Sequence, residues 1–492
     1  MNRSKALLLI LLTASLALAA CSGPSGSHVC TVNCTTGDAT VSFTLAAVPI
    51  APQPATSILS FAVTLNGIKL TPATGGTDVN VPLNTSTFVV DLTRLQSDSA
   101  FAGQVLANIP AGTYNQITVG IASAVVTYCT NAGVSAGCDP LSIKQVSEPF
   151  ATITPATFSA TFASGQQTGI QIRFDIGKAL TINTVTQAVT AVNLGATNVM
   201  TTVALPPLLS SLATGQLDFV EDFTGVVTAA SATSVTVQTS LRGSITANVT
   251  PTTIGSPNCV IDNKACVATV GQIASIDTVL NNDGTFSLLE YDPLSETSAD
   301  VVEGIVTATP LTSNQFDIVA NDILVASLGS VIGTSLGVGA PVHVTLNLGT
   351  NFFVIDTKGL TPIPATNFQG SQSATDILPG QTVALRVTSF TAATATVPAQ
   401  ITVDAVVLRF TRVAGAVSSA TSLTFNMQSL PLFFGPTNSF QTQLYSGSPS
   451  TYFDGITPGT NLTVGNTAAT RALYFGPTVT PAFTAAKVRQ FQ

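Results

Sequence analysis

The chain has 492 residues, of which 45% are hydrophobic and only 8% are charged, and its net charge at pH 7 is −8. This apolar content supports folded cores and excludes extensive disorder, and the length predicts more than one domain. The 16 Lys and Arg residues are scattered along an acidic chain, which excludes an electrostatic nucleic-acid binder.

The N-terminus predicts export. Arg3 and Lys5 precede an apolar run over 6–18, the layout of a signal peptide, and the run is too short to be a membrane span. Leu18-Ala19-Ala20-Cys21 resembles the lipobox of bacterial lipoproteins. The alternative is an ordinary cleaved signal followed by an incidental cysteine.

The lipobox resemblance implies cleavage before Cys21 and lipid attachment (palmitate among the acyl chains) to that residue. Two or more acyl chains make a stable membrane anchor. Residues 1–20 are then the signal peptide, and residues 21–38, rich in small polar residues, are a tether. Ser22 after the lipidated cysteine indicates outer-membrane sorting by analogy with known lipoproteins. The expected location is the bacterial cell envelope.

The remaining six cysteines fall in close pairs, and local disulfides are the expected arrangement in an oxidising compartment. Six cysteines allow 15 connectivities, so other pairings stay open. The neighbouring pairs are Cys30 with Cys34, Cys129 with Cys138, and Cys259 with Cys266.

From residue 39 the pattern is that of β-strands, with period-two alternation and frequent Gly, Pro and Asn turns. Many short strands predict an all-β fold, beginning with an antiparallel β-sandwich of the immunoglobulin or prealbumin kind over 39–205. A short helix is predicted over 93–106. The strands are expected at 41–45, 58–70, 87–92, 115–127, 157–162, 167–175 and 197–204.

One turn stands out, Pro110-Ala111-Gly112-Thr113-Tyr114, which enters a strand. Tyr114 is expected to close a corner, with its ring buried and its hydroxyl bonded to the backbone. With the strands at 40–45 and 88–92, this turn makes residues 39–205 resemble the uncharacterised family domain of unknown function 4382. The resemblance implies a fold and no activity.

The second half repeats itself. Similar strands open near Gly225, Gly304 and Gly415, and each is followed later by a glycine turn that feeds an alternating strand. This self-similarity predicts three small barrels, comparable in size to OB-type barrels. They resemble the uncharacterised family domain of unknown function 5666. The expected modules are 217–295, 300–410 with an insertion, and 411–492, and the expected glycine turns are at Gly271, Gly380 and Gly459.

The sequence predicts no catalysis, cofactor or metal site. A Ser-His-Asp set needs a placed histidine, and the chain has only His28 in the tether and His343 in a strand. A glycosidase needs two carboxylates facing one cleft. The acidic residues Glu290, Asp292, Glu296 and Asp300 are instead expected in a solvated connection between modules, and a Ca²⁺ ion bracing that linker is the alternative.

Aromatic residues near the C-terminus suit ligand binding, because a tyrosine ring has an apolar face and a polar tip. Tyr445, Tyr452 and Tyr474 are the candidates, although filling of a barrel interior is the favoured reading, because a small barrel also needs large aromatic side chains inside it. The sequence thus predicts a non-catalytic binding or adhesion protein for a polysaccharide or an envelope protein. The alternatives are a structural subunit of an envelope assembly and, less favoured, a carbohydrate-active enzyme.

Overall fold

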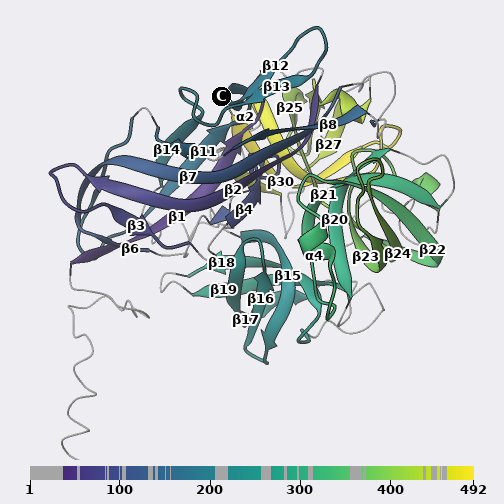
Figure 1. The fold of residues 1–492 in the computed structure, drawn as a ribbon, viewed down its shortest axis with the longest axis horizontal. Coiled ribbons are helices and arrows are strands. Elements are labelled where there is room, and N and C mark those ends of the chain that lie inside the picture. The colour runs from purple at the N-terminus through teal and green to yellow at the C-terminus, as the bar shows by residue number, and fades with distance from the viewer. Residues whose placement is uncertain are drawn as a thin grey trace, which may run out of the picture. The chain divides into compact units, whose positions relative to one another are not determined.

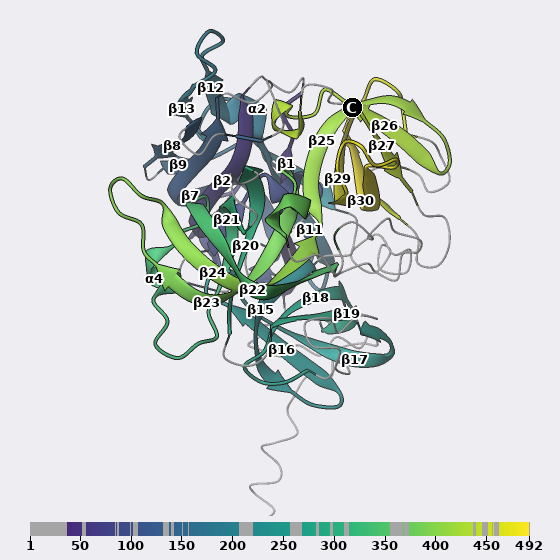
Figure 2. The ribbon, with the colours of Figure 1, turned by 90° about the vertical axis from the view of Figure 1, so that its right-hand side faces the viewer.

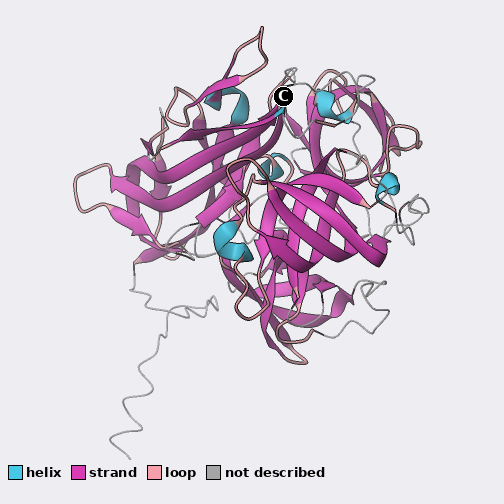
Figure 3. Ribbon diagram, turned by 45° about the vertical axis from the view of Figure 1, so that its right-hand side comes forward, coloured by secondary structure: helices cyan, strands magenta, loops and turns pink. Residues whose placement is uncertain are grey.

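The computed structural model describes residues 37–491 with internal gaps. The residues outside the description are 1–36, 52–55, 84, 86–87, 99, 102–106, 131–136, 139–141, 150, 156, 206–219, 256–267, 282–284, 296–298, 309–313, 355–367, 369–372, 436–438, 445–450, 455, 457–461 and 492. Strands dominate, and the helices are short (Figure 3). The predicted all-β fold is confirmed. In the described part, no helix has the length and apolar character to cross a membrane.

Two sheets form the N-terminal part, which we call the sandwich (Figure 1). The first sheet contains β1 (Asp38–Val48), β5 (Ala100–Phe101), β6 (Ala107–Pro110), β11 (Gln167–Asp175) and β14 (Met200–Leu205), in the order β14-β11-β1-β5 with β6 also on β1. The second contains β2 (Ser57–Pro72), β3 (Val79–Val81), β4 (Phe88–Asp91), β7 (Gly112–Cys129), β8 (Ile143–Glu148), β9 (Ala151–Ile153) and β10 (Ala160–Phe162) around the long β2–β7 pair. Helix α2 (Ile176–Ala179) leads into the hairpin β12 (Leu180–Ile182) and β13 (Val189–Val192).

One pair in the sandwich departs from the antiparallel arrangement. β1 and β11 run parallel, with Thr40 opposite Gln167 and Val48 opposite Asp175. Parallel strands need a long connection, and here most of the second sheet lies between them in the sequence. The N-terminal strand is therefore held between β11 on one side and β5 and β6 on the other.

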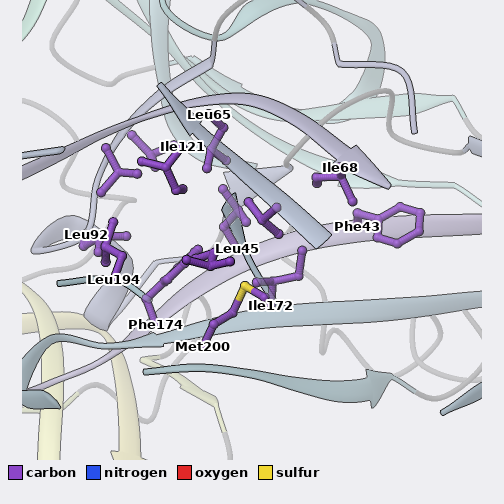
Figure 4. Packing of buried hydrophobic residues seen from close by; sticks show 14 of the residues in the cluster. Phe43, Leu45, Leu65, Ile68, Leu92, Ile121, Ile172, Phe174, Leu194 and Met200 are labelled. Carbon is purple, nitrogen blue, oxygen red and sulfur yellow. The ribbon is translucent and has the colours of Figure 1, made fainter. Parts of the chain in front are cut away.

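The inward faces of the two sheets make one apolar core. Figure 4 shows Phe43 and Leu45 of β1 and Phe174 of β11 facing Leu65 of β2 and Ile121 of β7. All five side chains are fully buried. The period-two alternation read from the sequence produces this face.

The helix predicted over 93–106 is wrong. Its described residues form the 3₁₀ turn η1 (Arg94–Gln96), in which Leu95 is buried, and then strand β5 of the first sheet. Pairing of Ala100 and Phe101 with β1 satisfies backbone groups that a helix would have bonded internally. The turn leaves Arg94 and Asp98 close to other parts of the chain.

Tyr114 closes a corner as the sequence predicts. Its ring is buried against Phe162, with the ring centroids 5.5 Å apart, and its hydroxyl donates to the carbonyl of Pro110 at 2.8 Å. Burial raises the pKa of the phenol above its ordinary value. The hydroxyl therefore stays protonated and keeps its donor role throughout the neutral range.

Replacement of Tyr114 by Phe should cost about 1 kcal/mol of stability, because one partly buried hydrogen bond is lost and the ring packing is kept. The denaturant midpoint of the transition that reports on the sandwich measures it. Thr113→Val is the control, since its hydroxyl contacts that of Thr161 in an exposed site. Equal effects of the two variants would contradict a special role for the corner.

Three five-stranded rings follow the sandwich (Figure 2), and we call them barrels A, B and C. Barrel A contains β15 (Val220–Ala230), β16 (Ser234–Thr239), β17 (Gly243–Gly255), β18 (Ile273–Leu280) and β19 (Phe286–Ser295). Barrel B contains β20 (Asp300–Ala308), β21 (Gln315–Leu324), β22 (Pro341–Val354), β23 (Thr382–Thr391) and β24 (Ala399–Arg409), with short helices α4 (Ile332–Ser335) and η5 (Ala374–Asp376). Barrel C contains β25 (Thr411–Ala420), β26 (Thr424–Gln428), β27 (Phe440–Gln443), β28 (Tyr452–Asp454), β29 (Thr467–Tyr474) and β30 (Phe483–Phe491), with η6 (Leu432–Phe434).

The three barrels share one topology. Barrels A and B close in the orders β15-β16-β17-β19-β18 and β20-β21-β22-β24-β23. In barrel C, pairing of β27 with β30 closes the corresponding ring, and β28 adds to β30 outside it. Each ring contains one parallel pair, formed by its third and last strands: β17–β19, β22–β24 and β27–β30.

Each barrel has a glycine turn, and the backbone hydrogen bonds of this turn are the same in all three barrels. The N–H groups of Gly271, Gly380 and Gly465 donate to Val227, Val306 and Val417, and each valine N–H donates to the carbonyl of the residue after the glycine. All three glycines have positive φ, which L side chains rarely adopt. The third turn is thus at Gly465 rather than at Gly459, which lies outside the described residues.

Candidate functional site

The most unusual chemistry in the described part is a buried cluster of charges where the sandwich and the three barrels meet. At its centre is Asp222 of β15, whose carboxylate pairs with Arg409 of β24, Arg412 of β25 and Arg471 of β29. The carboxylate oxygens lie 3.3 Å from Arg409 Nη2 and 3.3 Å from Arg471 Nε. Both of these arginine side chains are fully buried. We call this cluster the ionic junction.

The local backbone conformation directs the side chain of Asp222 toward the three arginines. The register of β15 against β18 shifts between Val220 and Phe223, and Asp222 itself has φ 51°. Its N–H donates to Asp277 Oδ1 at 2.7 Å, and Asp277 Oδ2 lies 3.4 Å from Arg471 Nη2. Asp and Asn are the non-glycine residues that adopt this left-handed region of φ most readily, so an aspartate suits this position.

Barrel B and the sandwich add a second pair of charges. Glu303 of β20 accepts from Arg94 Nη1 at 2.8 Å and lies 3.3 Å from Arg409 Nε. Arg409 also donates to Ser275 Oγ at 2.9 Å. Glu303 thus joins η1 of the sandwich to the last strand of its own barrel.

Barrel C completes the junction. Arg412 Nε lies 2.9 Å from Asp98 Oδ2 of the sandwich, and its Nη1 donates to the carbonyl of Phe410 at 2.6 Å. The Arg471 guanidinium lies over the ring of Phe410, 4.8 Å from its centroid, a favourable cation–π position. Arg489 donates to the carbonyls of Leu95 and Asp98, which ties β30 to the same turn of the sandwich.

The ion pairs described above join four carboxylates, those of Asp98, Asp222, Asp277 and Glu303, to four guanidiniums, those of Arg94, Arg409, Arg412 and Arg471. Burial opposes ionisation of Glu303, but Arg94, Arg409 and Arg412 outweigh it and hold its pKa below the ordinary value. Burial likewise opposes the charge of Arg412, yet Asp98 and Asp222 raise its pKa. Both groups stay charged at neutral pH.

A small cavity of about 60 Å³ lies beside the junction. Arg94 and Glu303 line one part of it, and apolar side chains including Ile58, Ile305 and Phe433 line the rest. A volume of this size holds a few water molecules. It is much smaller than the pockets that enclose drug-sized ligands.

The ion pairs of the ionic junction hold different parts of the chain together. Each of its carboxylates is engaged by a guanidinium, so none is poised as a general base, and arginine does not give up its proton near neutral pH. In the described part of the chain, no group of three or more His, Cys, Asp or Glu residues could hold a metal ion. His343 pairs with Asp317 at 2.8 Å on neighbouring strands of barrel B.

The predicted cysteine sites divide into two groups. Cys129 and Cys138 form a disulfide, as expected for that neighbouring pair. The N–H of Cys138 donates to Thr307 of barrel B at 2.6 Å, and the N–H of Gly137 donates to Phe433 of barrel C at 2.7 Å. The backbone of Gly137 and Cys138 is therefore bonded to both barrels. The lipid-attachment candidate Cys21 and the other paired cysteines lie outside the described residues: Cys30, Cys34, Cys259 and Cys266.

Of the tyrosines predicted to bind a ligand, Tyr474 must be corrected. It is 1% exposed and stacks on Phe483 with ring centroids 4.7 Å apart, so it fills the core of barrel C. Tyr452 is half-buried on β28 with the Lys487 ammonium 5.3 Å from its ring centroid. Tyr445 lies outside the described residues.

Three of the acidic residues expected in a solvated connection are buried instead, and the fourth, Glu296, lies outside the described residues. Glu290 and Asp292 lie in β19 and are 4% and 3% exposed. Asp300 begins β20, where its Oδ1 accepts from the N–H groups of Ala326 and Ser327 at 2.8 Å. The strands of barrels A and B extend almost to each other, which leaves few residues for a solvated linker.

Sequence reasoning missed the ionic junction. One signal was present, because Arg409 ends the apolar run Ala405-Val406-Val407-Leu408 in a chain with few charges. A charge at that place must find a partner or stay exposed. Which carboxylates meet it depends on contacts between parts of the chain that are distant in sequence, and alternation patterns do not carry that information.

The comparisons with known proteins concern the sandwich and the general fold. Residues 39–195 match the family described as Domain of unknown function (DUF4382). No curated protein matches the chain. Two similar solved structures are MbnP from Methylosinus trichosporium and a multidomain protein with nucleic acid binding domains from Streptococcus pneumoniae TIGR4.

Both structural likenesses are distant. MbnP is 12% identical with a TM-score of 0.18, and the match covers 35% of this chain and 99% of that one. The Streptococcus pneumoniae protein is 10% identical with a TM-score of 0.09, and the match covers 55% of this chain and 71% of that one. Neither contributes to the functional argument below.

Proposed function

We propose that this protein is a lipid-anchored cell-envelope protein that binds a polysaccharide or another envelope protein without catalysing a reaction. The observation that carries the proposal is the ionic junction. It ties the sandwich to all three barrels through buried ion pairs, and breaking a buried pair is costly. A chain fixed in this way presents its loops in one arrangement, which lowers the entropic cost of binding a partner.

The resemblance of residues 18–21 to a lipobox supports the anchoring part of the proposal. The surface supports recognition of neutral, hydrogen-bonding partners, because the chain has few ions and many hydroxyl and amide side chains. Tyr452 is the aromatic candidate for contact with a sugar, since it keeps a partly exposed ring beside Lys487.

A structural subunit of an envelope assembly is the second candidate. Its support is one uncharged strand edge in the sandwich, that of the six-residue β14. Such an edge is a template for pairing with another chain. The two candidates share the membrane anchor and differ in what occupies the exposed surface.

The anchor is tested by Cys21→Ser in the full-length protein. We expect loss of fatty-acid labelling and a shift from the membrane to the soluble fraction, because no lipid can be attached to serine in this position. Ser22→Ala is the control and should stay in the membrane. Membrane retention of the Cys21→Ser variant would contradict lipid anchoring.

Protease added to intact cells tests which face the protein occupies. Digestion of barrel C without lysis would favour adhesion or glycan capture at the surface. Protection until the outer membrane is broken would favour an envelope-scaffold role.

A further inference from the structure

The edges of the two sandwich sheets differ in how they are protected. Strands β3, β5, β9 and β10 have only two or three residues, and β6 ends in Pro110. β8 carries Lys144 and Glu148, and its Gln145 donates to Gly339 of barrel B. β4 is covered, since the N–H of Val89 donates to Leu241 of barrel A at 2.9 Å. Edge-to-edge pairing of strands is usually prevented by a short strand, by charged side chains, by proline or by another part of the chain that covers the edge.

β14 has none of these defences in the described part of the chain. It has six residues, Met-Thr-Thr-Val-Ala-Leu, with no charge, proline or glycine. One side pairs with β11 from Met200 to Leu205, and no described strand pairs with the other side. Thr201 and Ala204 are exposed, and Thr202 and Val203 are half-buried. Figure 1 shows β14 beside β11 in the first sheet.

We propose that β14 pairs antiparallel with β14 of a second copy of this chain, so that two five-stranded sheets join into one. A two-fold axis perpendicular to the sheet keeps each face on its own side, so facing residues must have the same orientation. Pairing centred on Thr202 satisfies this rule: it opposes Thr202 to itself, Met200 to Ala204 and Thr201 to Val203 of the partner.

The composition of β14 favours its own copy as the partner. Like charges directly opposite each other destabilise a sheet, and β14 has no charge to repel itself. On the face that Met200, Thr202 and Ala204 share, the long Met200 would oppose the small Ala204, and the two Thr202 hydroxyls are within reach of each other. Pro206 follows in the sequence and lacks a backbone donor, which favours a register kept within residues 200–204.

The pairing is expected to be weak in dilute solution. A six-residue strand pair buries less than the roughly 1,200 Å² at which stable interfaces begin. Anchoring of two copies in one membrane raises their effective concentration, and a weak contact then becomes populated. In this respect the inference rests on the anchoring proposed above.

Cysteine cross-linking of the full-length protein tests the pairing and its register. Thr202→Cys should give a disulfide-linked dimer on non-reducing gels, because facing Cα atoms in an antiparallel pair lie about 4.5–5.5 Å apart. Ala204→Cys is the matched control. It lies on the same face of the same strand, but its two copies would be roughly 14 Å apart along the strands. We expect about tenfold more dimer for Thr202→Cys than for Ala204→Cys, given the distance limit for disulfides.

The same variants are examined in membranes and as purified protein at high concentration, so that the anchor and the pairing are judged separately. Adding Val203→Lys to Thr202→Cys should remove the dimer while the thermal midpoint stays unchanged. No dimer in either setting, or equal dimer from both cysteine variants, overturns the pairing. Fractionation that finds the protein soluble overturns only the anchor, because the concentrated sample still reports on β14.

Discussion

Replacing Asp222 by asparagine is expected to lower the free energy of unfolding by about 3–5 kcal/mol, the range for removal of one partner from a buried ion pair. Asp222 faces three guanidiniums, and Arg409 and Arg471 have no exposed surface on which water could replace the lost carboxylate. Asparagine keeps the shape and tolerates the φ of 51°. The decrease in the free energy of unfolding therefore measures the removal of the charge and not backbone strain.

The measurement is denaturant unfolding of the full chain, with calorimetry as a second probe. Barrel A reaches the junction through Asp222 and Asp277, so its transition should separate to lower temperature in the variant. The matched control is Asp78→Asn, which breaks the exposed Lys69–Asp78 pair of the sandwich. Exposed ion pairs contribute little to stability, so the effect of this control should be small. Similar effects at the two positions would show that the ionic junction does not hold the barrels in place.

The sequence was sufficient for the parts of the fold that depend on local patterns. Alternation located β2, β7 and β11 to within a few residues, and the Gly112–Tyr114 turn predicted a corner that the Tyr114–Pro110 hydrogen bond closes. The repeated glycine strands predicted three copies of one module, and the barrels share one order of strands. Each of these features is encoded within a short stretch of chain.

Features that depend on distant contacts could not be predicted in this way. Glycine and alternation recur at Gly459 and predict the third turn there, but the hydrogen bonds that recur in all three barrels identify Gly465. From the sequence, Tyr474 is a candidate both for ligand contact and for filling of a barrel interior, and the packing of Phe434 and Phe483 around it identifies it as a core residue. Buried charges were the hardest case, because each is stable only with partners that other modules supply.

Acidification is expected to weaken the same junction, and Glu303→Gln isolates the contribution of one carboxyl. The folded-state pKa of Glu303 lies below its ordinary value of 4.5, so its ionised form stabilises the fold above that value. Below pH 4.5 the unfolded chain binds the proton first, and this stability is lost as the pH falls through the folded-state pKa. The slope from one such group is at most about 1.4 kcal/mol per pH unit.

Unfolding midpoints measured from pH 7 to pH 3 should therefore converge for the wild type and Glu303→Gln. At pH 7 the variant should be less stable by about 3 kcal/mol or more, since Arg94 and Arg409 lose a charged partner. Asp404→Asn in the same barrel is the control, because the Arg386–Asp404 pair is partly exposed and the difference there should be small. If the stability difference between the wild type and Glu303→Gln stays constant down to pH 3, its cause is a poor steric fit of glutamine. That result would contradict the argument from charge.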